Sequence, residues 1–120
     1  MAVHLDPVSS IPNLGPASQE GFAAAGIHSA QALRALGPDE AYLAYLCAGH
    51  RPHFIFYYAM VMGLQGRAWN DCKGAEKDGL RVRFDAIKAR AVAAQKGGAY
   101  GKGRTDSAAL EAFFNEIGLI

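Results

Sequence analysis

The stretch HFIFYYAMVMGLQGRAW, residues 53–69, is apolar at every position from residue 54 to residue 64 except Gly63. Its aromatic start, FIFYY, would also suit a buried β-strand. The stretch is too long for one strand, however, because strands usually run to about 3–10 residues. We therefore predict a helix. A helix without a polar face is typical of the central helix of a domain, wrapped by the others.

Gly63 and Gly66 lie within this predicted helix. A glycine in a helix interior costs about 1 kcal/mol relative to alanine, so we expect these two to allow another helix to approach closely. The apolar run from Phe54 to Leu64 has 11 residues. A bilayer span needs about 20, so we expect no membrane segment.

Proline, serine and glycine mark the ends of further helices on both sides of this stretch. Gly15-Pro16, Ser29 and Pro38 each begin a short helix, because proline suits the first helical position and serine is a good N-cap. The second of these helices is expected to bury Ala32, Leu33 and Leu36. Asp39 and Glu40 suit the first turn of the third, where the helix dipole favours carboxylates.

A longer helix is predicted over about residues 75–95, from the apolar spacing of Leu80, Phe84, Ile87 and Ala91. No stretch alternates polar and apolar residues with a period of two. The predicted fold class is therefore all-α, with about five or six helices, in a single domain over residues 1–95.

Residues 96–120 are predicted to form an extension of this domain. KGGAYGKG, residues 96–103, is typical of a flexible linker. A last helix follows, capped by Thr105, Asp106 or Ser107, with apolar residues Leu110, Phe113, Phe114 and Ile117. Such a short helix is marginal alone in water, so we expect it to dock on the body or on a second copy of the chain.

Charge is unevenly distributed along the 120 residues, although the net charge is only +1. Residues 1–60 carry two Lys/Arg against four Asp/Glu, whereas residues 67–104 carry ten against four. Several of these cations lie off the apolar stripe of the predicted helix 75–95: Arg81, Arg83, Lys88 and Arg90. They form either a solvated face or a surface for nucleic-acid phosphates. Arg67, before Trp69, is either a phosphate contact or a local salt bridge or cap of helix carbonyls.

The segment IPNLGPASQEGFAAAGIHSAQAL, residues 11–33, resembles the helix-hairpin-helix module at Pro12, Leu14, Gly15, Gly26 and Ile27. In that module a tight loop points backbone amides at a DNA phosphate. Asn13 stands in place of a loop glycine and tolerates positive φ, but Ala17 stands where a basic residue is usual. The loop at Asn13, Leu14 and Gly15 is thus either a phosphate contact or a packing or protein-contact element.

Motifs further along the chain sharpen the resemblance to one family. The order is Asn-Leu-Gly-Pro at 13–16, Gly-Ile at 26–27, Leu-Arg-Ala-Leu-Gly at 33–37 and Leu64-x-Gly-Arg-x-Trp69. Over roughly residues 8–92 this order resembles the C-terminal domain of TfoX, the regulator of natural DNA competence. The resemblance implies an all-helical domain with no catalytic centre. We predict a regulatory module, in competence or transcription, that acts through a protein partner or self-association. It also makes Asn13 the family's usual residue.

The sequence offers little for catalysis or metal binding. No nucleophile–base set, carboxylate pair or phosphate-binding glycine loop is present. Cys47, His50 and His53, with Cys72, have the ligand types of a zinc site, but Gly49 and Pro52 interrupt their helix, and we favour no metal and no cofactor.

The start of the chain, MAVHLDPVSS, shows no secretory signal. We therefore expect a cytoplasmic location, with both cysteines kept as thiols. Only about ten residues precede the family motif, so we expect a stand-alone C-terminal domain. Weak, sequence-independent DNA binding remains the alternative function.

Overall fold

The computed structural model describes residues 5–96 of the chain, and side chains as far as residue 94. These residues form five α-helices, two short 3-10 helices and no strand, which confirms the all-α prediction. The elements in order are η1 (Val8–Ser10), α1 (Pro16–Ala24), α2 (Ala30–Leu36), α3 (Pro38–Cys47), α4 (Phe54–Leu64), η2 (Trp69–Asp71) and α5 (Gly74–Lys96). The helix predicted after residue 104 lies outside the described residues.

The predicted helix starts are confirmed. Pro16 and Pro38 are the first residues of α1 and α3. Ser29 caps α2, where its hydroxyl accepts a hydrogen bond from the N–H of Ala32 at 3.0 Å. These local signals explain why the first half of the chain breaks into three short helices rather than one long one.

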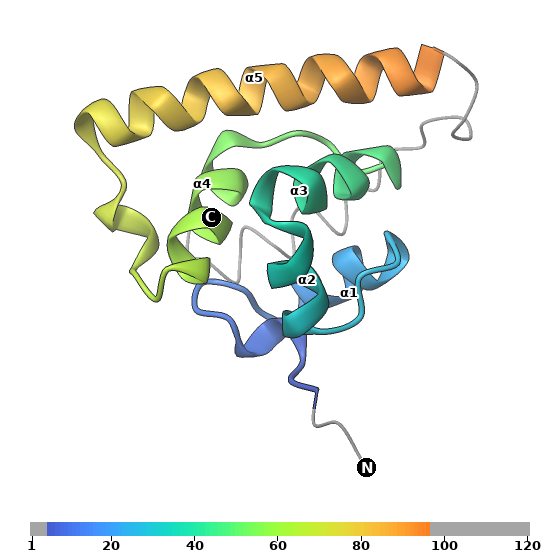
Figure 1. Cartoon of the computed structure of the whole chain (residues 1–120), viewed down its shortest axis with the longest axis vertical. Coiled ribbons are helices and arrows are strands. Elements are labelled where there is room, and N and C mark those ends of the chain that lie inside the picture. Colours follow the sequence, from blue (N-terminus) through green and yellow to red (C-terminus); the bar gives the residue numbers. More distant parts are fainter. Residues whose placement is uncertain (1–4, 97–120) are drawn as a thin grey trace.

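The long helix α5 runs across one side of the domain, and α3 and α4 pack beneath it (Figure 1). On the opposite side, α1 and α2 each pack against η1 and α3. None of the helices in residues 5–96 combines the length and the apolar character that crossing a membrane requires.

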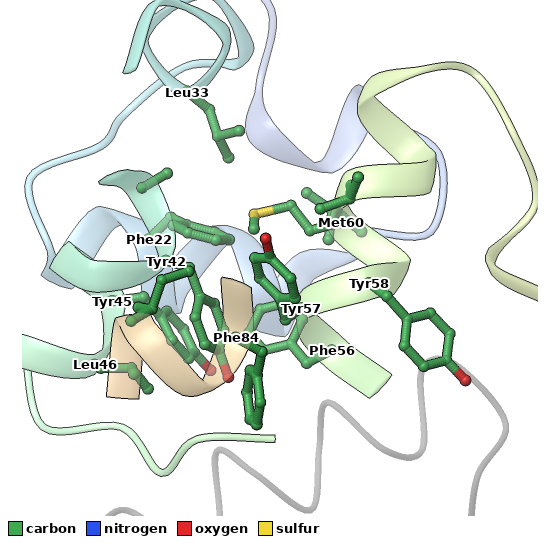
Figure 2. Packing of buried hydrophobic residues seen from close by; sticks show 14 of the residues in the cluster. Phe22, Leu33, Tyr42, Tyr45, Leu46, Phe56, Tyr57, Tyr58, Met60 and Phe84 are labelled. Atoms are coloured by element: carbon green, nitrogen blue, oxygen red, sulfur yellow. The ribbon is translucent and has the colours of Figure 1, made fainter. Parts of the chain in front are cut away.

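Helix α4 is central, as predicted, and every residue from Phe56 to Gly63 is buried. Aromatic rings from α1, α3 and α5 surround its first turns (Figure 2). The ring of Tyr42 in α3 has its centroid 5.3–5.9 Å from those of Tyr45, Phe56, Tyr57 and Phe84. The predicted stripe of α5 is also confirmed, because Leu80, Phe84, Ile87 and Ala91 are all buried.

Two expectations about this core were wrong. Helix α4 ends at Leu64, so Gly66 lies beyond it, in a turn where its φ is 74°. Leu36 is 47% exposed, although its spacing placed it on the buried face of α2. The helix ends at Leu36, and the chain turns at Gly37 to enter α3.

Gly63 does allow a close approach, but the neighbour is a loop and not another helix. A Cβ atom built on Gly63 would lie 2.0 Å from the carbonyl oxygen of Pro12. Atoms cannot approach so closely, so the backbone of the loop rests directly on the last turn of α4. Only glycine at position 63 leaves room for this contact.

We expect Gly63→Ala to lower the free energy of unfolding by about 3 kcal/mol, because the new methyl group must displace backbone. Gly79→Ala in α5 is the control, since a Cβ atom there meets nothing within 4 Å. That variant should be more stable by about 0.5–1 kcal/mol, the usual gain from replacing a helical glycine. Urea unfolding of both variants measures the two effects, and equal changes would contradict the role given to Gly63.

Candidate functional site

The loop predicted to meet phosphate lies against the body of the protein. Asn13 has a φ of 72°, as its tolerance of positive φ suggested. Its side-chain amide donates to the carbonyl oxygens of Ala59 at 2.9 Å and Arg67 at 3.0 Å. Leu14 is buried, and its N–H donates to Ile11 within the loop. Gly15 precedes α1 as its N-cap residue. The loop therefore holds together segments distant in sequence.

A second polar contact closes the same end of α4. Arg34 of α2 donates from Nη1 to the carbonyl oxygen of Leu64 at 2.8 Å. This carbonyl is one of the last in α4, where a cation is favoured by the helix dipole. Asn13, Arg34, Gly63 and Arg67, from separate sequence motifs, thus meet around one helix end.

The side chain of Arg67 is fully used within the chain. Its guanidinium forms a two-bond pair with Glu76, at 2.7 and 2.8 Å, and donates from Nε to Asp71 at 3.1 Å. The hydrogen bonds from Arg67 lower the pKa of Glu76. The pair ties the turn after α4 to the start of α5, while Trp69 between them packs against the core.

Two arginines of α5 pair with the carboxylates that begin α3. Arg83 donates to both oxygens of Asp39, at 2.9 and 2.7 Å, and Arg90 donates to both oxygens of Glu40, at 2.7 and 3.3 Å. Asp39 and Glu40 lie in the first turn of α3, as predicted. Besides suiting the dipole, they attach α5 to α3.

Asp39 is also bound from the core side. The hydroxyl of Tyr57 in α4 donates to its Oδ1 at 2.5 Å. Burial acts to raise the pKa of Asp39, but the hydrogen bonds from Arg83 and Tyr57 outweigh burial and hold that pKa below its ordinary value. Burial and the bond to Asp39 raise the pKa of Tyr57. Three helices therefore meet at one carboxylate.

Arg81 and Lys88 contact Asp85 on the same helix, at 3.2 and 3.5 Å. Both cations also lie over the ring of Phe84, at 5.4 and 5.0 Å from its centroid. All five cations predicted as phosphate contacts are therefore ion-paired within the described chain: Arg67, Arg81, Arg83, Lys88 and Arg90.

The residues weighed for a zinc site have other surroundings. His50 stacks on the ring of Tyr45, with centroids 4.1 Å apart, and Cys47 and Cys72 are buried thiols. Burial raises the pKa of Cys72 and lowers that of His53. Across residues 5–96, no three His, Cys, Asp or Glu residues are grouped so that they could hold a metal ion.

The fold and these contacts define a small helical domain in which Arg34, Arg83 and Arg90 each join two helices. The family model of the TfoX C-terminal domain matches residues 5–84, and the chain belongs to this family. Searches among curated proteins and among solved structures found no significant match.

We expect Asn13→Asp to destabilise the domain by about 2 kcal/mol or more. A carboxylate cannot donate, and its oxygens would face the carbonyls of Ala59 and Arg67. Asn13→Gly is the matched variant, because glycine adopts the positive φ and brings no charge. It should cost clearly less in thermal unfolding. If the two variants were equally stable, the side chain at position 13 would not face the carbonyls of Ala59 and Arg67.

Asp39 and Glu40 offer a second matched pair, since each binds one arginine of α5. Asp39→Ala leaves Tyr57 and Arg83 without an acceptor and should cost about 1–3 kcal/mol. Glu40→Ala removes a solvent-exposed pair that does not involve a core side chain, so its effect should be much smaller. Urea unfolding at neutral pH compares them.

The lowered pKa of Asp39 also predicts the pH dependence of this contribution. It is fully present at neutral pH and starts to fall as the pH approaches 3.8, the ordinary value of the carboxyl group. It is lost below the lower pKa of the folded state. Over that acid range, wild-type stability should fall more steeply than that of Asp39→Asn. Parallel curves would show that Asp39 does not contribute in this way.

Proposed function

We propose that this chain is a non-enzymatic regulatory module that acts through contacts with a protein partner, in the control of DNA transformation competence or of transcription. Membership of the TfoX C-terminal domain family supports the regulatory role. The observation that carries the mode of action is the internal pairing of the five cations that were candidates for phosphate contacts.

The ion pairs of these cations argue against DNA binding. Non-specific DNA affinity comes mainly from cations that replace the counterions of phosphates. Arg83 and Arg90 would first have to give up two-bond contacts to carboxylates. The loop at Asn13 is likewise committed to the carbonyls of Ala59 and Arg67. An incoming phosphate would compete with the bonds that hold the fold.

Apolar groups, by contrast, are available at the surface. Leu36 at the end of α2 is one of the large hydrophobic residues that the described structure leaves exposed. It is the first contact to test, because its neighbour Ala35 is exposed on the same helix and provides a matched control.

The partner hypothesis predicts that Leu36→Glu abolishes the change in competence-gene transcripts caused by overproducing the chain. Ala35→Glu, with the same charge one residue away, should keep it. Both variants should retain the wild-type melting temperature, since neither side chain is buried. Equal activity of the two variants would exclude this end of α2 as the contact.

Weak, sequence-independent DNA binding is the second candidate, and it rests on the excess of cations over residues 67–104. It predicts that binding to a random duplex falls steeply between about 50 and 200 mM salt. It also predicts that binding is lost in the double variant Arg81→Glu, Lys88→Glu. We expect instead no duplex binding at 50 mM salt, and saturable binding with that salt dependence would overturn the proposal.

A further inference from the structure

Helix α5 has a second apolar face, opposite the one that packs on the core. Its members are spaced alternately by four and three residues, and all of them are exposed: Ala75, Gly79, Val82, Ala86, Ala89 and Ala93. Val82 is 70% exposed, and a Cβ atom at Gly79 would meet nothing within 4 Å. We call these six residues the outer stripe. Figure 1 shows no described helix on this side of α5.

The spacing of the outer stripe is informative. Alternate steps of three and four residues form the heptad pattern by which one helix packs along another. A helix with a single partner layer needs one apolar face, whereas α5 has two. The small side chains would let a partner helix approach closely and would accept large side chains from it.

The chain itself carries a segment with the complementary pattern. Leu110, Phe113, Ile117 and Ile120 are spaced by three, four and three residues. Their side chains are large, whereas those of the outer stripe are mostly small. A helix over residues 105–120 would be about 24 Å long, and the outer stripe extends about 27 Å along α5. The eight residues 97–104 would then be the connection, and this length is common between antiparallel helices.

A second copy of the chain fits the outer stripe less well. Two faces built of Ala, Gly and one Val would bring little area together, compared with the roughly 1,200–2,000 Å² buried in stable interfaces. In an antiparallel two-fold pair each flank of α5 also meets the same flank of its partner. Asp78 and Asp85, which lie beside the stripe, would then lie on the same side of the pair as Asp78 and Asp85 of the other copy. A tethered segment needs far less area, because its effective concentration is already in the millimolar range.

We propose that residues 105–120 fold back as a helix antiparallel to α5 and cover the outer stripe. The inner face of α5 then packs on α3 and α4. Its outer face packs on the C-terminal segment, and the two form a helical hairpin. This inference does not depend on the proposed function.

Hydrogen exchange of the full chain tests the proposal, with two valines of α5 as a matched pair. Val82 lies on the outer stripe, whereas Val92, 49% exposed, lies about a quarter-turn away from it. Amides of residues 108–118 should be protected in the wild type. Val82→Glu should reduce that protection at least tenfold, and Val92→Glu should leave it unchanged. Phe113→Ser should have the effect of Val82→Glu, and combining the two should add little.

Each other outcome overturns the proposal. Unprotected amides over 108–118 in the wild type would show that the segment does not dock. Protection that ignores Val82→Glu would place it elsewhere, such as the pocket lined by Ala24, Ala25, Ala44, Cys47 and Ala48. Protection that rises with protein concentration, together with a dimer mass in sedimentation, would assign the stripe to a second copy. Unchanged protection of the α4 amides is the check that every variant is folded.

Discussion

The contact between the Pro12 carbonyl and Gly63 is the constraint on which the rest of the domain depends. It brings two backbones together without an intervening side chain, so nothing at position 63 can adjust. The amide of Asn13 then bonds carbonyls on both sides of the α4 terminus. Arg67, whose carbonyl it holds, reaches Glu76 at the start of α5 with its side chain. The N-terminal loop therefore sets the end of α4 and, through Arg67, the position where α5 begins.

From that starting point α5 is aligned by its contacts with α3. Phe84 joins the aromatic cluster around Tyr42, and the pairs of Arg83 with Asp39 and Arg90 with Glu40 follow along the rim. Exposed ion pairs add little stability individually, but their two-bond geometry is specific. Because each pair occupies its cation, a phosphate would have to displace a carboxylate in order to bind there. Arg83 and Arg90, two of the cations in excess over residues 67–104, are thereby paired with carboxylates from the first half of the chain.

Local signals were sufficient to predict most helices, and distant contacts were not. Pro16, Ser29 and Pro38 act within one turn of their own position, so their effects could be predicted from sequence. Arg83 and Asp39 are 44 positions apart in the sequence, and no pattern in either segment predicts that they pair. The role of Gly63 could be predicted only in part. Its small size predicted a close approach, but only the fold shows that a loop makes it. The spacing of Leu36 predicted its burial wrongly, because spacing does not show how far neighbouring elements cover the last turn of α2.

The two faces of α5 differ in a way that follows from what each must contact. The inner face carries Leu80, Phe84 and Ile87, large side chains that fill the space above α3 and α4. The outer stripe carries almost only Ala and Gly, which cost little when solvent-exposed and still leave a helix able to accept a close neighbour. A helix built only to cap the core would have charged residues there, as its flanks do. The small residues of the outer stripe are therefore the observation on which the proposed docking of residues 105–120 rests.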